Sequence, residues 1–218
     1  EIYQNARADT QVEVFEEAAL SFLNPNPAFQ NSCITPLPAR PDDRPFCLCV
    51  TFNLPHGAST STMQLRPSDD ELYRTAYRDK QDQLALPETY LSFHEEVENP
   101  KIPRDIYNGV RISQYDYVKT PNLLKERQVR TCQTVTGMDR MIGRLREELE
   151  ILGLAENTII IFSTDHGLHH GEHGLGGKCF LYEQDISIPM VVMDPRSKGK
   201  CEGKPNNELV VAPDLGPT

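Results

Sequence analysis

Four of the six histidines of this 218-residue chain lie at positions 166, 169, 170 and 173, in the stretch IIIFSTDHGLHHGEHGLGGK. The first of them, His166, directly follows Asp165 at the end of an apolar run. A carboxylate beside an imidazole can bind a divalent cation, so this pair is a candidate for metal chemistry. Alternatively, Asp165 caps the following turn and His166 makes only local hydrogen bonds. The pair by itself leaves both interpretations open.

The spacing of the four histidines would place them on one face of a helix, which would suggest a zinc cluster. The same stretch also holds five glycines, and each glycine inside a helix costs roughly 1 kcal/mol relative to alanine. These glycines are Gly167, Gly171, Gly174, Gly176 and Gly177. We therefore expect a glycine-rich loop, whose backbone can approach a ligand closely, in place of a four-histidine zinc site.

Two further residues could act on an anion. Lys178 follows the glycine stretch and could direct an ammonium at an anionic oxyester, although most lysines are simply exposed to water. His56 stands in the loop NLPHG, directly after Pro55. Its imidazole could serve as an acid, a base or an anion ligand, or it could bond only to nearby backbone. Neither residue alone identifies a reaction.

Three apolar runs are predicted to be strands, at 46–52, 158–165 and 186–194, the first two buried. In the first run, Cys47 and Cys49 lie two residues apart, so their side chains share a face of the strand, and we expect both to be small buried apolar groups. The chain has six cysteines and no Cys-x-x-Cys pair, which leaves the disulfide state open.

The helix pattern is clearest from Pro121 to the expected stop at Gly153. Its apolar positions recur at steps of three and four, with charges on the opposite side. They are Val135, Met138, Ile142, Leu145, Leu149 and Leu152. A shorter amphipathic helix is predicted over 8–23. Segment 57–120 is rich in helix breakers and is predicted to be an excursion that shapes the rim of a pocket.

Strands that alternate with helices indicate an α/β sheet, in which sites lie beyond the carboxyl ends of the strands. The loops that hold His56 and Asp165 both follow predicted strands. The net charge of −10 argues against nucleic acid or an anionic membrane as a partner, but a local cationic pocket could still bind an anionic substrate. No run of about 18 apolar residues predicts a membrane span.

Four stretches occur in the order and separation of one known family. They are RPFCLCVTFNLPHG, VTGMDRMIGRLREELEILGLAENTIIIFSTDHG, GEHGLGGKCFLYEQDISIPMVV and VVAPDLGPT. Together they closely resemble the sulfatases of the alkaline-phosphatase superfamily, which carry a Pro-His loop, a DNTIVIFTSDHG-like strand end, GEHGLxGK and YExxIxxPxxV. The match is continuous over 120–218, patchier over 44–120 and faint before 44.

The resemblance implies an alkaline-phosphatase-like α/β fold, with a mainly parallel or mixed sheet flanked by helices, incomplete in this chain. It implies that Asp165 and His166 ligate a divalent cation, most often Ca²⁺, with Mg²⁺, Mn²⁺ or Zn²⁺ in other members. It implies that His56 and Lys178 bind sulfate oxygens and that one of them helps to protonate the leaving alcohol oxygen. His169 and His173, at positions often occupied by histidine, are expected to shape the loop.

One part of the family pattern is absent from these residues. Sulfatases use a formylglycine made from the Cys or Ser of a C/S-x-P-x-R motif, and none of the six cysteines or any serine lies in that motif. We therefore expect residues 1–218 to be a partial catalytic domain, without the nucleophile segment and the smaller carboxy-terminal subdomain. The formylglycine is expected outside this chain, and the chain alone is expected not to turn over a sulfate ester.

The leading hypothesis from the sequence is a sulfuric ester hydrolase that acts on a small-molecule or glycan sulfate. One alternative is a phosphonate or phosphate-diester hydrolase of the same superfamily. Another is a non-catalytic sulfatase-like domain that binds a metal or a glycan. By family analogy the protein is expected to be periplasmic, secreted or of lysosomal type. Nothing in segment 57–120 identifies the sulfated group.

Overall fold

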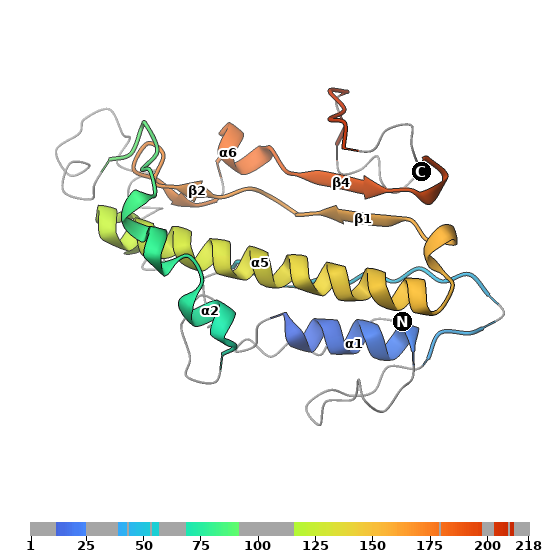
Figure 1. The fold of residues 1–218 in the computed structure, drawn as a ribbon. Helices are drawn as coiled ribbons and strands as arrows, with labels where there is room; N and C mark the ends of the chain where they lie inside the picture. Colours follow the sequence, from blue (N-terminus) through green and yellow to red (C-terminus); the bar gives the residue numbers. More distant parts are fainter. Residues whose placement is uncertain are drawn as a thin grey trace.

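The computed structural model describes residues 12–24, 39–42, 44–52, 54–56, 69–91, 116–178, 180–197, 203–208 and 210–211. The elements follow in the order α1 (Glu13–Leu23), α2 (Glu71–Thr75), η3 (Arg78–Gln83), η4 (Asp116–Val118), α5 (Pro121–Ile151), η5 (Ala155–Asn157), β1 (Ile160–Ser163), β2 (His169–His170), β3 (Gly176–Gly177), α6 (Glu183–Ile186), β4 (Met190–Met193) and η6 (Pro195–Ser197), where η marks a 3-10 helix. Figure 1 shows α1 and α2 on one side of α5 and the strands β1 and β4 on the other.

The long helix α5 confirms the helix predicted from Pro121. The Thr120 side chain accepts a hydrogen bond from the Leu123 amide at 3.3 Å, and Pro121 occupies the first turn, where its missing N–H costs nothing. The helix ends at Ile151, and Gly153 follows with a left-handed φ of +68°. Both ends therefore lie where the local sequence signals placed them.

A hydrophobic core forms between α1 and α5. It contains Val12, Leu54, Met138 and Met141, with Phe15, Phe52, Ile142 and Leu145 packed around it. Leu54 lies two residues before His56, so burial of this leucine anchors the loop that carries the histidine. Helix α1 is described from Glu13, and the earlier residues of the predicted helix lie outside the described residues.

The predicted apolar stripe of α5 is wrong at one end. Val135 is 48% exposed, whereas Gln133 and Thr134 are fully buried. Gln133 can be buried at little cost because its Nε2 atom donates to the carbonyl of Ala76 at 2.8 Å. The buried face of α5 therefore includes hydrogen-bonded polar residues at this end of the helix, and Val135 lies outside that face.

Strands β1 and β4 pair antiparallel, with Ile161 opposite Val192. The prediction that the strand at 158–165 is buried is wrong for the described residues, since Ile161 is 51% exposed. Among these residues each of the two strands has the other as its one hydrogen-bonded neighbour. The described pairing is thus antiparallel, and a parallel part of the sheet stays a prediction.

Segment 46–52 is extended but belongs to no sheet among the described residues. Its side chains alternate between partly buried and exposed, with Phe46 and Phe52 turned inward. The prediction that Cys47 and Cys49 are buried is wrong, because the described structure packs only one face of the segment. Both are exposed free thiols, as is Cys132.

The glycine-rich stretch folds as a short hairpin. His169 and His170 pair with Gly177 and Gly176, and Gly171 and Gly174, between the strands, have left-handed φ values of 94° and 73°. The prediction that glycines prevent a helix here is confirmed. None of the helices in the described part of the chain combines the length and apolar character needed to cross a bilayer.

Candidate metal and anion site

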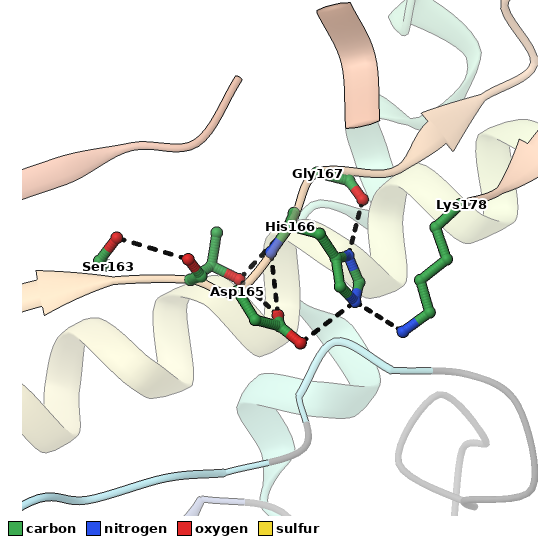
Figure 2. Close-up of polar contacts among 6 residues, drawn as sticks. Ser163, Asp165, His166, Gly167 and Lys178 are labelled. Atoms are coloured by element: carbon green, nitrogen blue, oxygen red, sulfur yellow. Dashed lines mark hydrogen bonds and ion pairs between the residues drawn. The ribbon is translucent and has the colours of Figure 1, made fainter. Parts of the chain in front are cut away.

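Asp165 and His166 leave strand β1 in a short loop that is ordered by its own hydrogen bonds (Figure 2). The Asp165 carboxylate accepts from the His166 amide at 3.1 Å. The Nδ1 atom of His166 lies 2.8 Å from the carbonyl of Gly167. Asp165 is largely exposed and His166 is partly buried. The two side chains are thus held together at the strand end and remain accessible from one side.

The bond to Gly167 assigns the tautomer of His166. A carbonyl oxygen can only accept, so Nδ1 carries the proton and Nε2 keeps its lone pair. This Nε2 lies 3.3 Å from Oδ2 of Asp165 and 2.6 Å from Nζ of Lys178. The Lys178 ammonium therefore donates to the imidazole, and a carboxylate oxygen lies beside the same lone pair (Figure 2).

This donor set fits a divalent cation. Ligand atoms in protein sites lie about 2.0–2.6 Å from the ion, so two ligands 3.3 Å apart can share one. A metal-binding histidine usually donates its other ring N–H to a carbonyl or carboxylate, and His166 does so to Gly167. Among the described residues no group of three or more possible ligands gathers, so this pair would supply two ligands.

Lys178 is placed by the hairpin. It directly follows strand β3, and the Gly177 amide donates to the Tyr117 hydroxyl at 2.7 Å. Sequence reasoning gave Tyr117 no role, because it lies in a weakly patterned segment. The lysine is partly buried, with its ammonium beside the His166 ring. The candidate cation-binding pair Asp165 and His166 therefore lies in contact with a cationic side chain, an arrangement suited to an anionic ester.

The loop of His56 is linked to this region through other residues. Its neighbour Pro55 offers its carbonyl to the Nη2 atom of Arg127, near the start of α5, at 2.9 Å. The Arg127 guanidinium lies over the Tyr117 ring, 4.9 Å from its centroid. The structure thus brings Asp165, His166 and Lys178 into direct contact and connects the His56 loop to them through Arg127 and Tyr117.

A buried histidine–aspartate pair braces the loop between His166 and Lys178. His169 is fully buried, and its Nδ1 lies 2.7 Å from Oδ1 of Asp185. The other oxygen of Asp185 accepts from the Phe180 amide, and its carbonyl accepts from the Gly167 amide. Asp185 therefore holds residues on both sides of the hairpin. Sequence spacing alone gave no signal for this role.

We expect Asp185→Asn to lower the free energy of unfolding by about 2–3 kcal/mol, because a buried carboxylate that accepts two hydrogen bonds would become an amide with one acceptor oxygen. Denaturant unfolding of this chain measures the loss. Asp194→Asn is the matched control, since its partner Arg196 is exposed and the pair should contribute far less. Equal losses in the two variants would contradict the bracing role.

His173 ties the hairpin to segment 84–91. Its backbone is left-handed, with φ of 55°, and its amide donates to the carbonyl of Thr89 at 2.9 Å. Its ring stacks on Tyr182 with centroids 5.4 Å apart. Tyr90 forms an isolated bridge with Glu172 beside it. These contacts agree with the expectation that His169 and His173 shape the loop.

His170 should make stability depend on pH. Burial lowers the pKa of His170 below its ordinary value near 6.5, the nearby Arg127 and His169 lower it further, and Glu172 raises it. Below about pH 6.5 His170 is protonated in the unfolded chain but stays neutral in the folded chain, so the free energy of unfolding falls as pH falls. His170→Gln should give a shallower decline in unfolding free energy between about pH 7 and pH 5. An unchanged slope would exclude this origin.

Comparison with known proteins identifies the family. The sulfatase profile matches residues 31–218, so the chain belongs to the sulfatase family. It is 29% identical over 202 residues to an arylsulfatase of Clostridium perfringens, covering 90% of this chain and 37% of that protein. The sequence resemblance is thereby confirmed.

Two relatives that match shorter parts of the chain have names that mention a sugar or an extracellular location. The chain is 39% identical over 98 residues to the extracellular sulfatase SULF-1 homolog of Drosophila melanogaster, covering 44% of this chain and 8% of that protein. It is 36% identical over 85 residues to N-acetylglucosamine-6-O-sulfatase of Bacteroides thetaiotaomicron, covering 39% of this chain and 15% of that protein. The chain thus spans less than a sixth of the length of these curated relatives.

Among solved structures, a protein in complex with its substrate D-glucosamine-2-N,6-O-disulfate matches with a TM-score of 0.34 and 23% identity. The match covers 49% of this chain and 26% of that chain.

Proposed function

We propose that this chain is part of a sulfatase that hydrolyses a sulfate monoester. The observation that carries the proposal is the contact among Asp165, His166 and Lys178, in which a carboxylate oxygen, an imidazole lone pair and an ammonium meet within 3.3 Å. Membership of the sulfatase family supports the reaction class. The overall negative charge of the chain makes a local cationic group the more important for an anionic substrate.

Asp165 and His166 are the proposed ligands of a divalent cation, most often Ca²⁺ in this family. When bound, the cation would draw negative charge toward the site and lower the cost of bringing a nucleophile to the sulfate. Binding at Nε2 of His166 would occupy the lone pair that Lys178 uses here. The ammonium would then have all three N–H donors available for sulfate oxygens.

His56 and Lys178 are the proposed anion-binding residues. A sulfate monoester spreads its charge over three terminal oxygens, which cationic and N–H donors can stabilise. One of the two residues would also protonate the departing alcohol oxygen. The formylglycine that sulfatases use as nucleophile is proposed to come from another part of the whole protein, since no cysteine of this sequence lies in the required motif.

A sulfated glycan is the proposed substrate class. The relatives include an N-acetylglucosamine-6-O-sulfatase and an extracellular sulfatase, and these names support a sulfated sugar outside the cell. We also propose that the protein is exported. In the described part of the 57–120 excursion, Thr89 and Tyr90 contact the hairpin, which supports a role for that segment at the rim of the site.

We further propose that β1 and β4 belong to a larger mixed sheet of alkaline-phosphatase type. Their half-exposed apolar residues support this proposal, because such side chains would gain from cover by further elements of the whole domain. Residues 1–218 are accordingly proposed to be part of one catalytic domain.

The decisive experiment compares substrates with the whole protein that contains this chain. We expect hydrolysis of 4-nitrophenyl sulfate and N-acetylglucosamine 6-sulfate that is lost on chelation and restored by a divalent cation. Faster hydrolysis of phosphate diesters or phosphonates would replace the proposal by the diesterase alternative. Metal or glycan binding without any turnover would establish the non-catalytic alternative. Residues 1–218 alone are expected to be inactive.

A further inference from the structure

Arg127 is a buried cation in an unusual setting. Only 9% of its surface is exposed, and burial lowers the pKa of its guanidinium. Among the described residues no carboxylate pairs with it, and its Nε atom is buried without a hydrogen-bond partner. Burying a cation without a carboxylate partner opposes folding. The contacts of Arg127 with Tyr117 and Pro55 are therefore better explained by a role in the site than by a gain in stability.

Those contacts lead to the two proposed anion-binding residues. On one side, Arg127 donates to the carbonyl of Pro55, the residue before His56. On the other, the guanidinium lies on the Tyr117 ring, whose hydroxyl accepts from the amide of Gly177, the residue before Lys178. The fork of Arg127 and the flat face of the tyrosine make both contacts directional.

The Tyr117 hydroxyl bonds to both strands of this hairpin. While it accepts from Gly177, it donates to the carbonyl of His169 at 3.1 Å. One phenol thereby holds both strands of the hairpin, β2 and β3, at the register that precedes Lys178. A shift of this ring would move the lysine, and a shift of the guanidinium would move the Pro-His loop.

We propose that Arg127 and Tyr117 are positioning residues that fix the separation of His56 and Lys178. His56 and Lys178 lie more than 100 positions apart in the sequence. The side chains of Arg127 and Tyr117 connect their neighbours, Pro55 and Gly177. The proposal rests on the proposed function, because it assumes that His56 and Lys178 act on one sulfate group. Misplacement by about 1 Å of groups that bind a reacting centre can cost roughly 100-fold in rate.

The test uses two esters that differ in their need for protonation. An alkyl sulfate such as N-acetylglucosamine 6-sulfate has a poor leaving group that needs a proton, whereas 4-nitrophenyl sulfate needs little help. In the whole protein, Arg127→Met and Tyr117→Phe should each lower kcat/KM for the alkyl ester by about 10- to 100-fold, mainly through kcat, and much less for the aryl ester. Arg127→Lys should recover part of the loss.

Lys125→Met is the matched control, because Lys125 also lies on α5 and donates to a backbone carbonyl, that of Asp82, but is only partly buried and, within the described part of the chain, makes no hydrogen bond to either proposed anion-binding loop. It should leave both esters unaffected. Equal losses on the two esters would show that the variants merely reduce the amount of folded enzyme, and would overturn the proposal. So would unchanged rates in Arg127→Met and Tyr117→Phe.

A second measurement separates this proposal from the proposed function. If the whole wild-type protein hydrolyses neither ester, the proposed function fails, and the bridge is then judged by nuclear magnetic resonance of the whole protein with labelled histidines. Tyr117→Phe removes the hydroxyl that holds the ring to the hairpin, so the ring and the guanidinium packed on it should shift, and the imidazole signals of His56 should move with them. Signals as in Lys125→Met would show that no bridge connects the two segments.

Discussion

Replacing Lys178 by methionine is expected to lower kcat/KM for a sulfate ester by about 10²- to 10³-fold in the whole protein. Methionine matches the unbranched apolar stem of lysine and lacks the ammonium. This ammonium lies 2.6 Å from the His166 imidazole, beside the proposed metal ligands, where it can neutralise charge on the sulfate oxygens. If the ammonium stabilises the charge of the transition state more strongly than that of the bound substrate, kcat should fall more than KM rises.

Steady-state kinetics with 4-nitrophenyl sulfate measure this effect, and Lys125→Met again serves as the control. Lys178→Arg keeps the charge but places it on a larger planar group, so it should recover only part of the rate. Divalent-cation binding, measured by calorimetry, should persist in Lys178→Met because the proposed ligands Asp165 and His166 remain. A wild-type kcat/KM in Lys178→Met would show that Lys178 does not act on the sulfate group.

The long helix and the central cluster could be predicted because their signals are local. Proline at the start of α5 and Gly153 after its end mark the boundaries directly. Asp165 and His166 are adjacent, and Lys178 follows within the same motif. The family resemblance implied that Asp165 and His166 bind a cation and that Lys178 binds sulfate oxygens, and the structure places Lys178 in contact with His166.

The contacts that brace the site could not be predicted in this way. Asp185 and His169 are 16 residues apart, Tyr117 and Gly177 are 60 apart, and Arg127 and Pro55 are 72 apart. Each pair depends on how hairpin and helix pack, which no single stretch encodes. The same reason explains Val135, whose exposure follows from the burial of polar neighbours.

Gly167→Ala is expected to disrupt the loop that carries the proposed metal ligands. A Cβ atom at this position would lie 1.9 Å from the backbone carbonyl oxygen of Gln184 and 3.3 Å from that of Ser187. Neither carbonyl can move as a flexible side chain would, so the loop itself must shift. We expect a loss of about 3 kcal/mol or more in the free energy of unfolding, measured by denaturant titration.

The displaced loop should also change the site, because two bonds depend on this glycine. Its amide donates to the carbonyl of Asp185 at 2.8 Å, and its carbonyl fixes the ring of His166. The imidazole signals of His166 should therefore broaden or move. Gly143→Ala is the matched control, since nothing lies within 4 Å of its Cβ position. Within α5 this alanine should stabilise by up to about 1 kcal/mol. If Gly167→Ala were tolerated as well as Gly143→Ala, close backbone packing would not be what holds Asp165 and His166 in place.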